Sequence, residues 1–151
     1  MVANSQRTQK GKQGWHFLLE EVNLEEKMGN YLHLKVWQIA MELAVAVFTM
    51  IQNNPKFRKE WSLSDQMRRS AVSISSNIAE GESMDSDKHG LHFFIMARSS
   101  LAELTTQIEI ARQCALLPQN ESEKLINTGT QVGKMLSGLI KAKRKAIEAR
   151  G

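Results

Sequence analysis

Apolar residues in this chain recur at alternating steps of three and four positions, and this spacing constrains the fold more than any other feature. Such positions run from Leu34 to Ile51 and again from Phe94 to Ala115, where they line one side of a helix that packs nearly parallel to its neighbours. A β-strand would need alternation with a period of two, and no such run exceeds a few residues. The sequence therefore predicts an all-α protein.

Helix-breaking residues between the apolar stretches set the predicted helix ends. Pro55 and Pro118 each follow a long stretch, and the residue before a proline avoids the helical region. Ser62 followed by Asp65 predicts a capped helix start, and Gly81 predicts the end of the same helix. The predicted helices cover residues 32–52, 62–81, 87–117 and 120–150. Long helices joined by short polar loops predict an antiparallel up-down-up-down four-helix bundle.

The first thirty residues differ from the rest of the chain. Residues 15–27 carry apolar side chains at helical spacing, but the stretch is short and acidic in its second half, so only a weak helix is expected. Gly29 and Asn30 tolerate the left-handed conformation that ends helices. We therefore predict a tail with a weak helix in residues 1–30 and the four-helix bundle in residues 31–151.

The composition suits one soluble domain, because a chain of 151 residues with 42% hydrophobic side chains can bury a core without disulfides or metals. The longest apolar run, residues 36–51, contains Gln38 and Glu42 and is shorter than the roughly 20 residues that span a bilayer. No apolar signal-peptide core follows the basic N-terminus, so a cytoplasmic location without membrane contact is expected. Cys114 shares a helical face with apolar residues and is expected to be buried and inert.

Catalytic motifs are missing from the sequence. It has no phosphate-binding glycine loop, no paired cysteines and no nucleophile elbow. Asp85, His89 and His92 could share one helix face as metal ligands, but an acid at a helix start is common and the spacing is a loose signature. We therefore expect no enzyme activity, no metal and no cofactor, and keep a metal enzyme as a distant alternative.

The end of the predicted fourth helix is strongly basic. Residues 134–150 hold six basic side chains and one acid, Glu148, in a chain of net charge +4. Cations near a helix C-terminus interact favourably with the helix dipole, which is one explanation. The other is a patch that binds the phosphates of RNA or DNA. Under that hypothesis the nucleic-acid contacts are Lys141, Lys143, Arg144 and Lys145.

The second predicted helix carries a polar stripe. The first carries apolar residues besides those of its seam, which are the positions that step by three and four: Leu34, Trp37, Met41, Ala44, Phe48 and Ile51. The stripe is either a solvated face or a set of small groups that hydrogen-bond across a helix interface. The extra apolar residues favour burial on more than one side and therefore an oligomer. The stripe consists of Arg69, Ser73, Ser76, Asn77 and Glu80, and the extra apolar residues are Val36, Ile39, Leu43, Val45 and Val47.

The stretch SLSDQMRRSAVSISSNIAEGE, residues 62–82, resembles a family of small four-helix-bundle proteins. These proteins are encoded by open reading frames within intervening sequences of bacterial 23S ribosomal RNA genes. The resemblance continues in YLHLKVWQIA, residues 31–40, and ARSSLAELTTQIEIA, residues 97–111, and so covers about three quarters of the chain. The sequence departs from the pattern at His33, Ser70 and Ser99, where aspartate, alanine and glycine are usual. None of these changes breaks a bundle.

The resemblance implies a bundle that assembles into a ring, commonly of five subunits, without enzymatic activity. It also implies a relationship to the accessory variability determinant of diversity-generating retroelements, which binds nucleic acid and a reverse transcriptase. The family's motif positions are expected to hold the bundle and its neighbours in register. They fall here on Gln66, Arg68, Arg69, Ser73, Asn77, Glu80, Gly81, Ser100 and Glu103.

Two hypotheses for function follow. The first is a homo-oligomer, by resemblance a pentameric ring, that binds RNA or DNA without reading sequence. The second is an oligomeric scaffold for a protein partner that does not bind nucleic acid.

Overall fold

The computed structural model describes residues 30–151, of which Tyr31–Gly151 form one packed unit. The predicted weak helix in residues 15–27 lies outside the described residues. No strand occurs among residues 30–151. The elements are η1 (Asn30–His33), α3 (Lys35–Asn53), η2 (Pro55–Arg58), α4 (Trp61–Ser83), α5 (Asp87–Gln113) and α6 (Gln119–Arg150), where η denotes a 3₁₀ helix.

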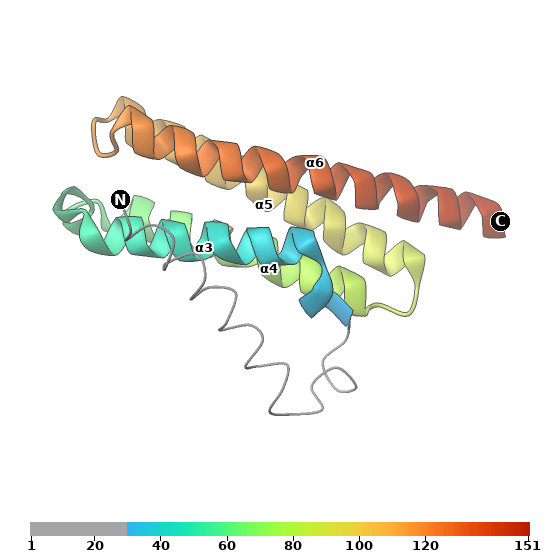
Figure 1. Ribbon diagram of the computed structural model, residues 1–151. Helices are drawn as coiled ribbons and strands as arrows, with labels where there is room; N and C mark the ends of the chain where they lie inside the picture. Colours follow the sequence, from blue (N-terminus) through green and yellow to red (C-terminus); the bar gives the residue numbers. More distant parts are fainter. Residues whose placement is uncertain (1–29) are drawn as a thin grey trace, which may run out of the picture. The chain divides into compact units, whose positions relative to one another are not determined.

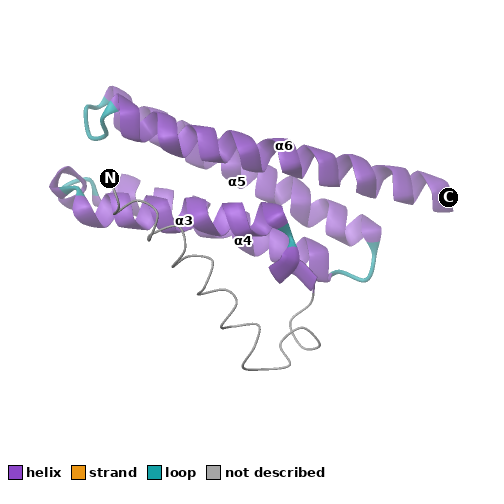
Figure 2. Ribbon diagram, in the orientation of Figure 1, coloured by secondary structure: helices purple, strands orange, loops and turns teal. Residues whose placement is uncertain are grey.

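The four long helices form a bundle in which each helix packs against two others (Figure 1). The helix α3 contacts α4 and α6, and α5 contacts the same two helices from the opposite corner. Short linkers join successive helices, so each helix runs back along the one before it (Figure 2). The all-α four-helix bundle predicted from the sequence is confirmed.

Large apolar side chains from all four helices fill the centre of the bundle. Val47 of α3, Ile74 of α4, Phe94 of α5 and Leu136 of α6 are each 0% exposed. Burial of one such side chain contributes about 1.5–3 kcal/mol relative to leaving it in water. The shared core therefore holds the four helices together.

The helix α3 turns more apolar residues inward than the predicted seam contains. Val36, Ile39, Leu43 and Val47 were predicted on a second face, but all four are buried in the core of this chain. Phe48, a predicted seam residue, is instead 40% exposed. Trp37, Ala44 and Ile51 of the predicted seam are buried as expected. The prediction was wrong for the other positions because α3 is apolar around most of its circumference, so spacing alone cannot select the inward face.

Among the helices of residues 30–151, only α3 has the length and the mean hydropathy, 1.2, that a membrane-spanning helix would need. The core helix of a bundle has the same properties, and 44% of this stretch is buried within the bundle. Its apolar character exceeds what the core uses, because Val45 on the outer side is 57% exposed.

The start of α4 differs from the predicted cap. The helix begins at Trp61, and no side chain caps its first turn. Ser62 therefore does not act as the predicted cap. Nearby, the Ser64 hydroxyl donates to the carbonyl oxygen of Glu60 at 2.8 Å. The prediction failed because α4 begins at Trp61 with Glu60 at the N-cap position, so Ser62 lies within the first turn of the helix.

Gly81 does not end α4, which continues to Ser83. A Cβ atom at Gly81 would lie 2.7 Å from Cε1 of Phe94 and 3.0 Å from the carbonyl oxygen of Gly90. Glycine is therefore needed at this position because α4 and α5 approach closely here. The sequence alone cannot distinguish a glycine that ends a helix from one that lets a partner helix come close.

The helix α5 ends at Gln113, four residues before the predicted end at Leu117. Ala115 has a φ of 55°, the left-handed conformation that stops the helix. The freed carbonyl of Ala115 accepts a hydrogen bond from Nζ of Lys56 at 2.8 Å. Cys114 lies in this turn and is exposed, so the prediction of a buried thiol was wrong, because it assumed that the helix continued.

Candidate nucleic-acid interface

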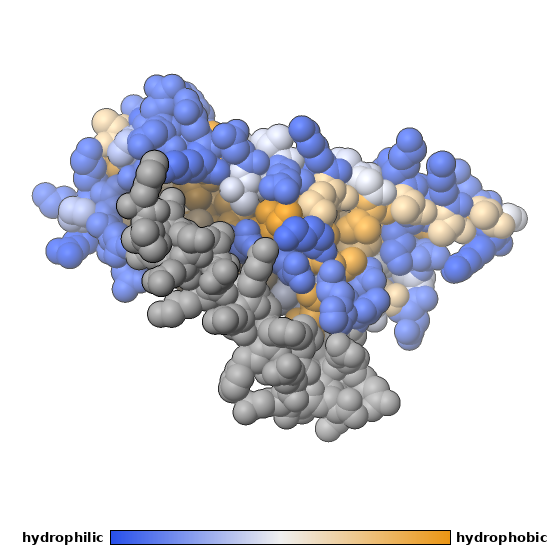
Figure 3. Space-filling view, viewed as in Figure 1, coloured by the Kyte–Doolittle hydropathy of each residue, from blue (hydrophilic) through white to orange (hydrophobic). Residues whose placement is uncertain are grey.

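The helix α6 carries a long stretch without acidic residues. Between Glu123 and Glu148 every charged side chain is basic. In Figure 3 hydrophilic residues alternate with apolar ones along the C-terminal part of α6. The basic residues of this stretch are Lys124, Lys134, Lys141, Lys143, Arg144 and Lys145.

Three of the four predicted contact residues are free on the surface. Lys141, Arg144 and Lys145 are exposed and form no ion pair within residues 30–151. Lys134, Lys141 and Lys145 follow one another at intervals of seven and four residues, so they lie along one side of the helix. At 1.5 Å per residue this row is about 16 Å long.

Lys143, the fourth predicted contact, pairs with a carboxylate of the same chain. Its Nζ lies 2.8 Å from Oδ1 of Asp87, and the side chain is 22% exposed. Nη1 of Arg150 lies 2.7 Å from Oδ2 of the same carboxylate. The hydrogen bond from Lys143, together with the charges of both cations, lowers the pKa of Asp87 below its ordinary value of 3.8. The pairs tie the end of α6 to the start of α5.

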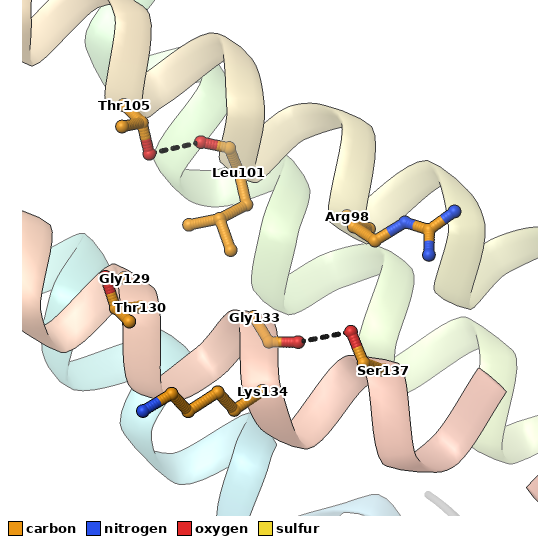
Figure 4. Close-up of a pocket in the computed structure, with 8 residues that line it drawn as sticks. All are labelled: Arg98, Leu101, Thr105, Gly129, Thr130, Gly133, Lys134 and Ser137. Atoms are coloured by element: carbon orange, nitrogen blue, oxygen red, sulfur yellow. Dashed lines mark hydrogen bonds between the residues drawn. The ribbon is translucent and has the colours of Figure 1, made fainter. Parts of the chain in front are cut away.

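A groove between α5 and α6 adjoins the row of lysines. It has a volume of about 540 Å³ and is lined by both helices (Figure 4). Leu101 of α5 points toward α6, and Gly129 and Gly133 of α6 make room for it, because a Cβ at either glycine would lie 3.2 Å from a Leu101 methyl carbon. The lining residues are Arg98, Leu101, Thr105, Gly129, Thr130, Gly133, Lys134 and Ser137.

Arg98 was missed by the sequence analysis. It is an isolated basic residue on α5, far in sequence from the basic end of α6. Only the antiparallel pairing of the two helices brings it to the groove that Lys134 and Ser137 also line. No local spacing signal could have identified it.

The family-motif residues form a polar seam where α4 packs on α5. The hydroxyls of Ser73 and Ser100 are 2.9 Å apart, and Nδ2 of Asn77 donates to the Ser73 hydroxyl at 3.0 Å. The Ser70 hydroxyl, at a position where the sequence departs from the family pattern, donates to Oε2 of Glu103 at 3.4 Å. Small hydrogen-bonding side chains therefore join these two helices.

The remaining motif residues have separate environments. Nε of Arg69 lies 2.7 Å from Oδ2 of Asp65, and the guanidinium carbon of Arg68 lies 5.7 Å from the centre of the Phe48 ring. Gln66 and Glu80 are exposed, as is Ser76 of the polar stripe, and Gly81 is buried between α4 and α5.

The candidate metal ligands named from the sequence do not gather into a site. Asp85, His89 and His92 are exposed. Within the part of the chain that the structure describes, no group of three histidine, cysteine, aspartate or glutamate residues could hold a metal ion.

Comparisons with known proteins identify a family and a solved structure with a similar fold. The sequence pattern of the family described as 23S rRNA-intervening sequence protein matches residues 32–138. A crystal structure of a protein with unknown function from the S23 ribosomal protein family of Bacteroides thetaiotaomicron is similar, with a TM-score of 0.67 and 25% sequence identity. The match covers 70% of this chain and 98% of that chain. No curated protein matches the chain at a significant level.

Proposed function

Because this chain belongs to the 23S rRNA-intervening sequence protein family, we propose that it is a non-enzymatic homo-oligomer that binds the phosphate backbone of RNA or DNA without reading sequence. The proposed contacts are Lys141, Arg144 and Lys145 of α6. They are exposed and form no ion pair within residues 30–151, and no acid interrupts the helix between Glu123 and Glu148. Unpaired cations on one helix face attract a polyanion and release its counterions.

The pairing of Asp87 supports this proposal and changes the role of Lys143. Asp87 is the acid that faces the end of α6, and Lys143 and Arg150 both neutralise it. Lys143 therefore positions α6 and leaves phosphate binding to its neighbours. Arg150 is 74% exposed and could exchange its partner more easily than Lys143.

The proposed oligomer rests on exposed apolar side chains in two places. Val45 and Phe48 are exposed on α3. Phe48 lies beside Arg68 of α4, and Val72 of α4 is 46% exposed. Met96 and Ile110 are exposed on α5, which lies diagonally across the bundle from α3. A ring needs two different surfaces that meet head to tail. Two apolar surfaces supply this, and the family resemblance favours five subunits.

Nucleic-acid binding is tested with a labelled RNA hairpin and a labelled DNA duplex over a salt series. A variant in which Lys141, Arg144 and Lys145 become alanine should bind both ligands more weakly. Its salt slope should flatten by about three, since each lost phosphate contact removes about 0.9. The matched control replaces Lys35, Arg58 and Lys59, which are also exposed basic residues, and loses the same charge.

Equal binding by the two variants would contradict the assignment of α6. Absence of binding by the unaltered protein at low salt would contradict the proposed function itself. A defined oligomer without nucleic-acid affinity would instead favour the protein scaffold, and the search would turn to protein partners.

A further inference from the structure

We propose that a phosphodiester strand of the bound nucleic acid lies along the α5–α6 groove, with Arg98 and Lys134 contacting its phosphates. This inference rests on the proposed function and adds a second helix to the binding surface. The inference also predicts that this surface binds duplex or folded nucleic acid in preference to unstructured single strands.

The charges of the groove fit a linear polyanion. Arg98 and Lys134 form no ion pair within residues 30–151. Their side chains extend toward opposite ends of the groove (Figure 4). Two cations aimed apart cannot enclose one small anion, but they can contact separate phosphates of one strand. No acidic residue lines the groove, so nothing there opposes such a ligand.

The groove walls allow close approach of a backbone. Thr105, Thr130 and Ser137 each donate their hydroxyl hydrogen to a carbonyl of their own helix at 2.9 Å. These side chains are therefore short and already satisfied as donors, and their oxygens can still accept hydrogen bonds. A strand entering the groove displaces no internal hydrogen bond.

Gly138 is a separate observation on the same surface. A Cβ atom there would meet nothing within 4 Å, so packing inside the chain does not require glycine. A glycine in a helix interior costs roughly 0.5–1 kcal/mol relative to alanine. It lies beside Ser137 and between Lys134 and Lys141, where a bare helix surface lets a phosphate backbone come near.

The groove has no means of holding unpaired bases by stacking. Neither its lining nor any residue of α6 is aromatic, whereas single-strand sites commonly stack successive bases on aromatic side chains. The ligand that fits this surface is therefore recognised by its phosphates and shape, as a duplex is.

The test compares the unaltered protein with a variant in which Arg98 and Lys134 become alanine, using a labelled RNA duplex over a salt series. We expect the salt slope to flatten by about two and the affinity at about 0.1 M salt to fall about tenfold or more. The charge-preserving variant with Arg98→Lys and Lys134→Arg should bind as the unaltered protein does. A control variant with Lys35→Ala and Lys59→Ala carries the same charge change on other exposed residues.

The outcomes separate this inference from the function on which it rests. If the α6 variant loses binding while the groove variant keeps the original slope, the groove is not part of the site and the proposed function stands. If the groove variant changes the mass in solution instead of the slope, the groove receives another copy of the chain and the inference fails. A uridine-only single strand that binds as tightly as the duplex would also overturn it.

Discussion

A close approach of α4 and α5 at Gly90 gives a prediction that can be worked out from distances. Gly90 is buried in the first turns of α5, and a Cβ atom there would lie 2.7 Å from the carbonyl oxygen of Gly81. Ordinary van der Waals contact begins at 3.4 Å. Because the opposing atom is backbone, no side chain can rotate away. Gly90→Ala should therefore force the two helices apart.

The expected loss of stability is the difference between two effects. Overpacking of this kind costs about 1–3 kcal/mol, and the rigid contact at Gly90 places it near the upper value. Alanine gains up to about 1 kcal/mol over glycine within a helix. The free energy of unfolding should therefore fall by about 2 kcal/mol. Gly138→Ala is the matched control: with open space around the new Cβ, it should raise stability by about 0.5–1 kcal/mol.

The assay is urea denaturation followed by far-ultraviolet circular dichroism at one protein concentration, since the stability of an oligomer depends on concentration. The two variants should shift the midpoint in opposite directions with an unchanged slope. If Gly90→Ala unfolds at the same urea concentration as Gly138→Ala, the argument from close approach is refuted.

Three further predictions follow from the described residues. Asp87 has a lowered pKa in the folded protein, so its ion pairs stabilise the fold at a pH above the unfolded pKa of 3.8 and lose this effect as the pH falls through the lower folded pKa. Asp87→Asn should remove that acid dependence and speed amide exchange severalfold in the last turns of α6. Unchanged exchange would contradict the role of the pairs. Val45→Asp should lower the mass of the particle in solution while the bundle stays folded, whereas Val47→Asp, at a position 0% exposed, should prevent folding at a cost of several kcal/mol. Light scattering measures the mass and circular dichroism measures the folding. An unchanged mass for Val45→Asp would argue against the proposed interface. Cys114 is exposed, so a maleimide should label the folded protein about as fast as the denatured one, and protection in the folded state would show that an oligomer or another segment covers the turn.

Local sequence signals determined the helix content and most of the helix ends. The steps of three and four predicted helices because side chains at those spacings share one face of a helix. Pro55 and Pro118 marked the interruptions correctly, since proline restricts the residue before it and lacks an amide donor. The basic stretch of α6 was also visible, because charge is a property of each residue alone.

The tertiary structure decided which faces meet and which charges remain free. Spacing could not orient α3, because apolar residues surround most of that helix. In sequence, Gly81 cannot be distinguished from a glycine that ends a helix. The structure shows that a glycine is needed at this position because the Phe94 ring of another helix packs against it. Lys143 resembles its basic neighbours until Asp87 is placed beside it. Each of these outcomes depends on an atom from a distant segment, and helical periodicity carries no information about which segments come together.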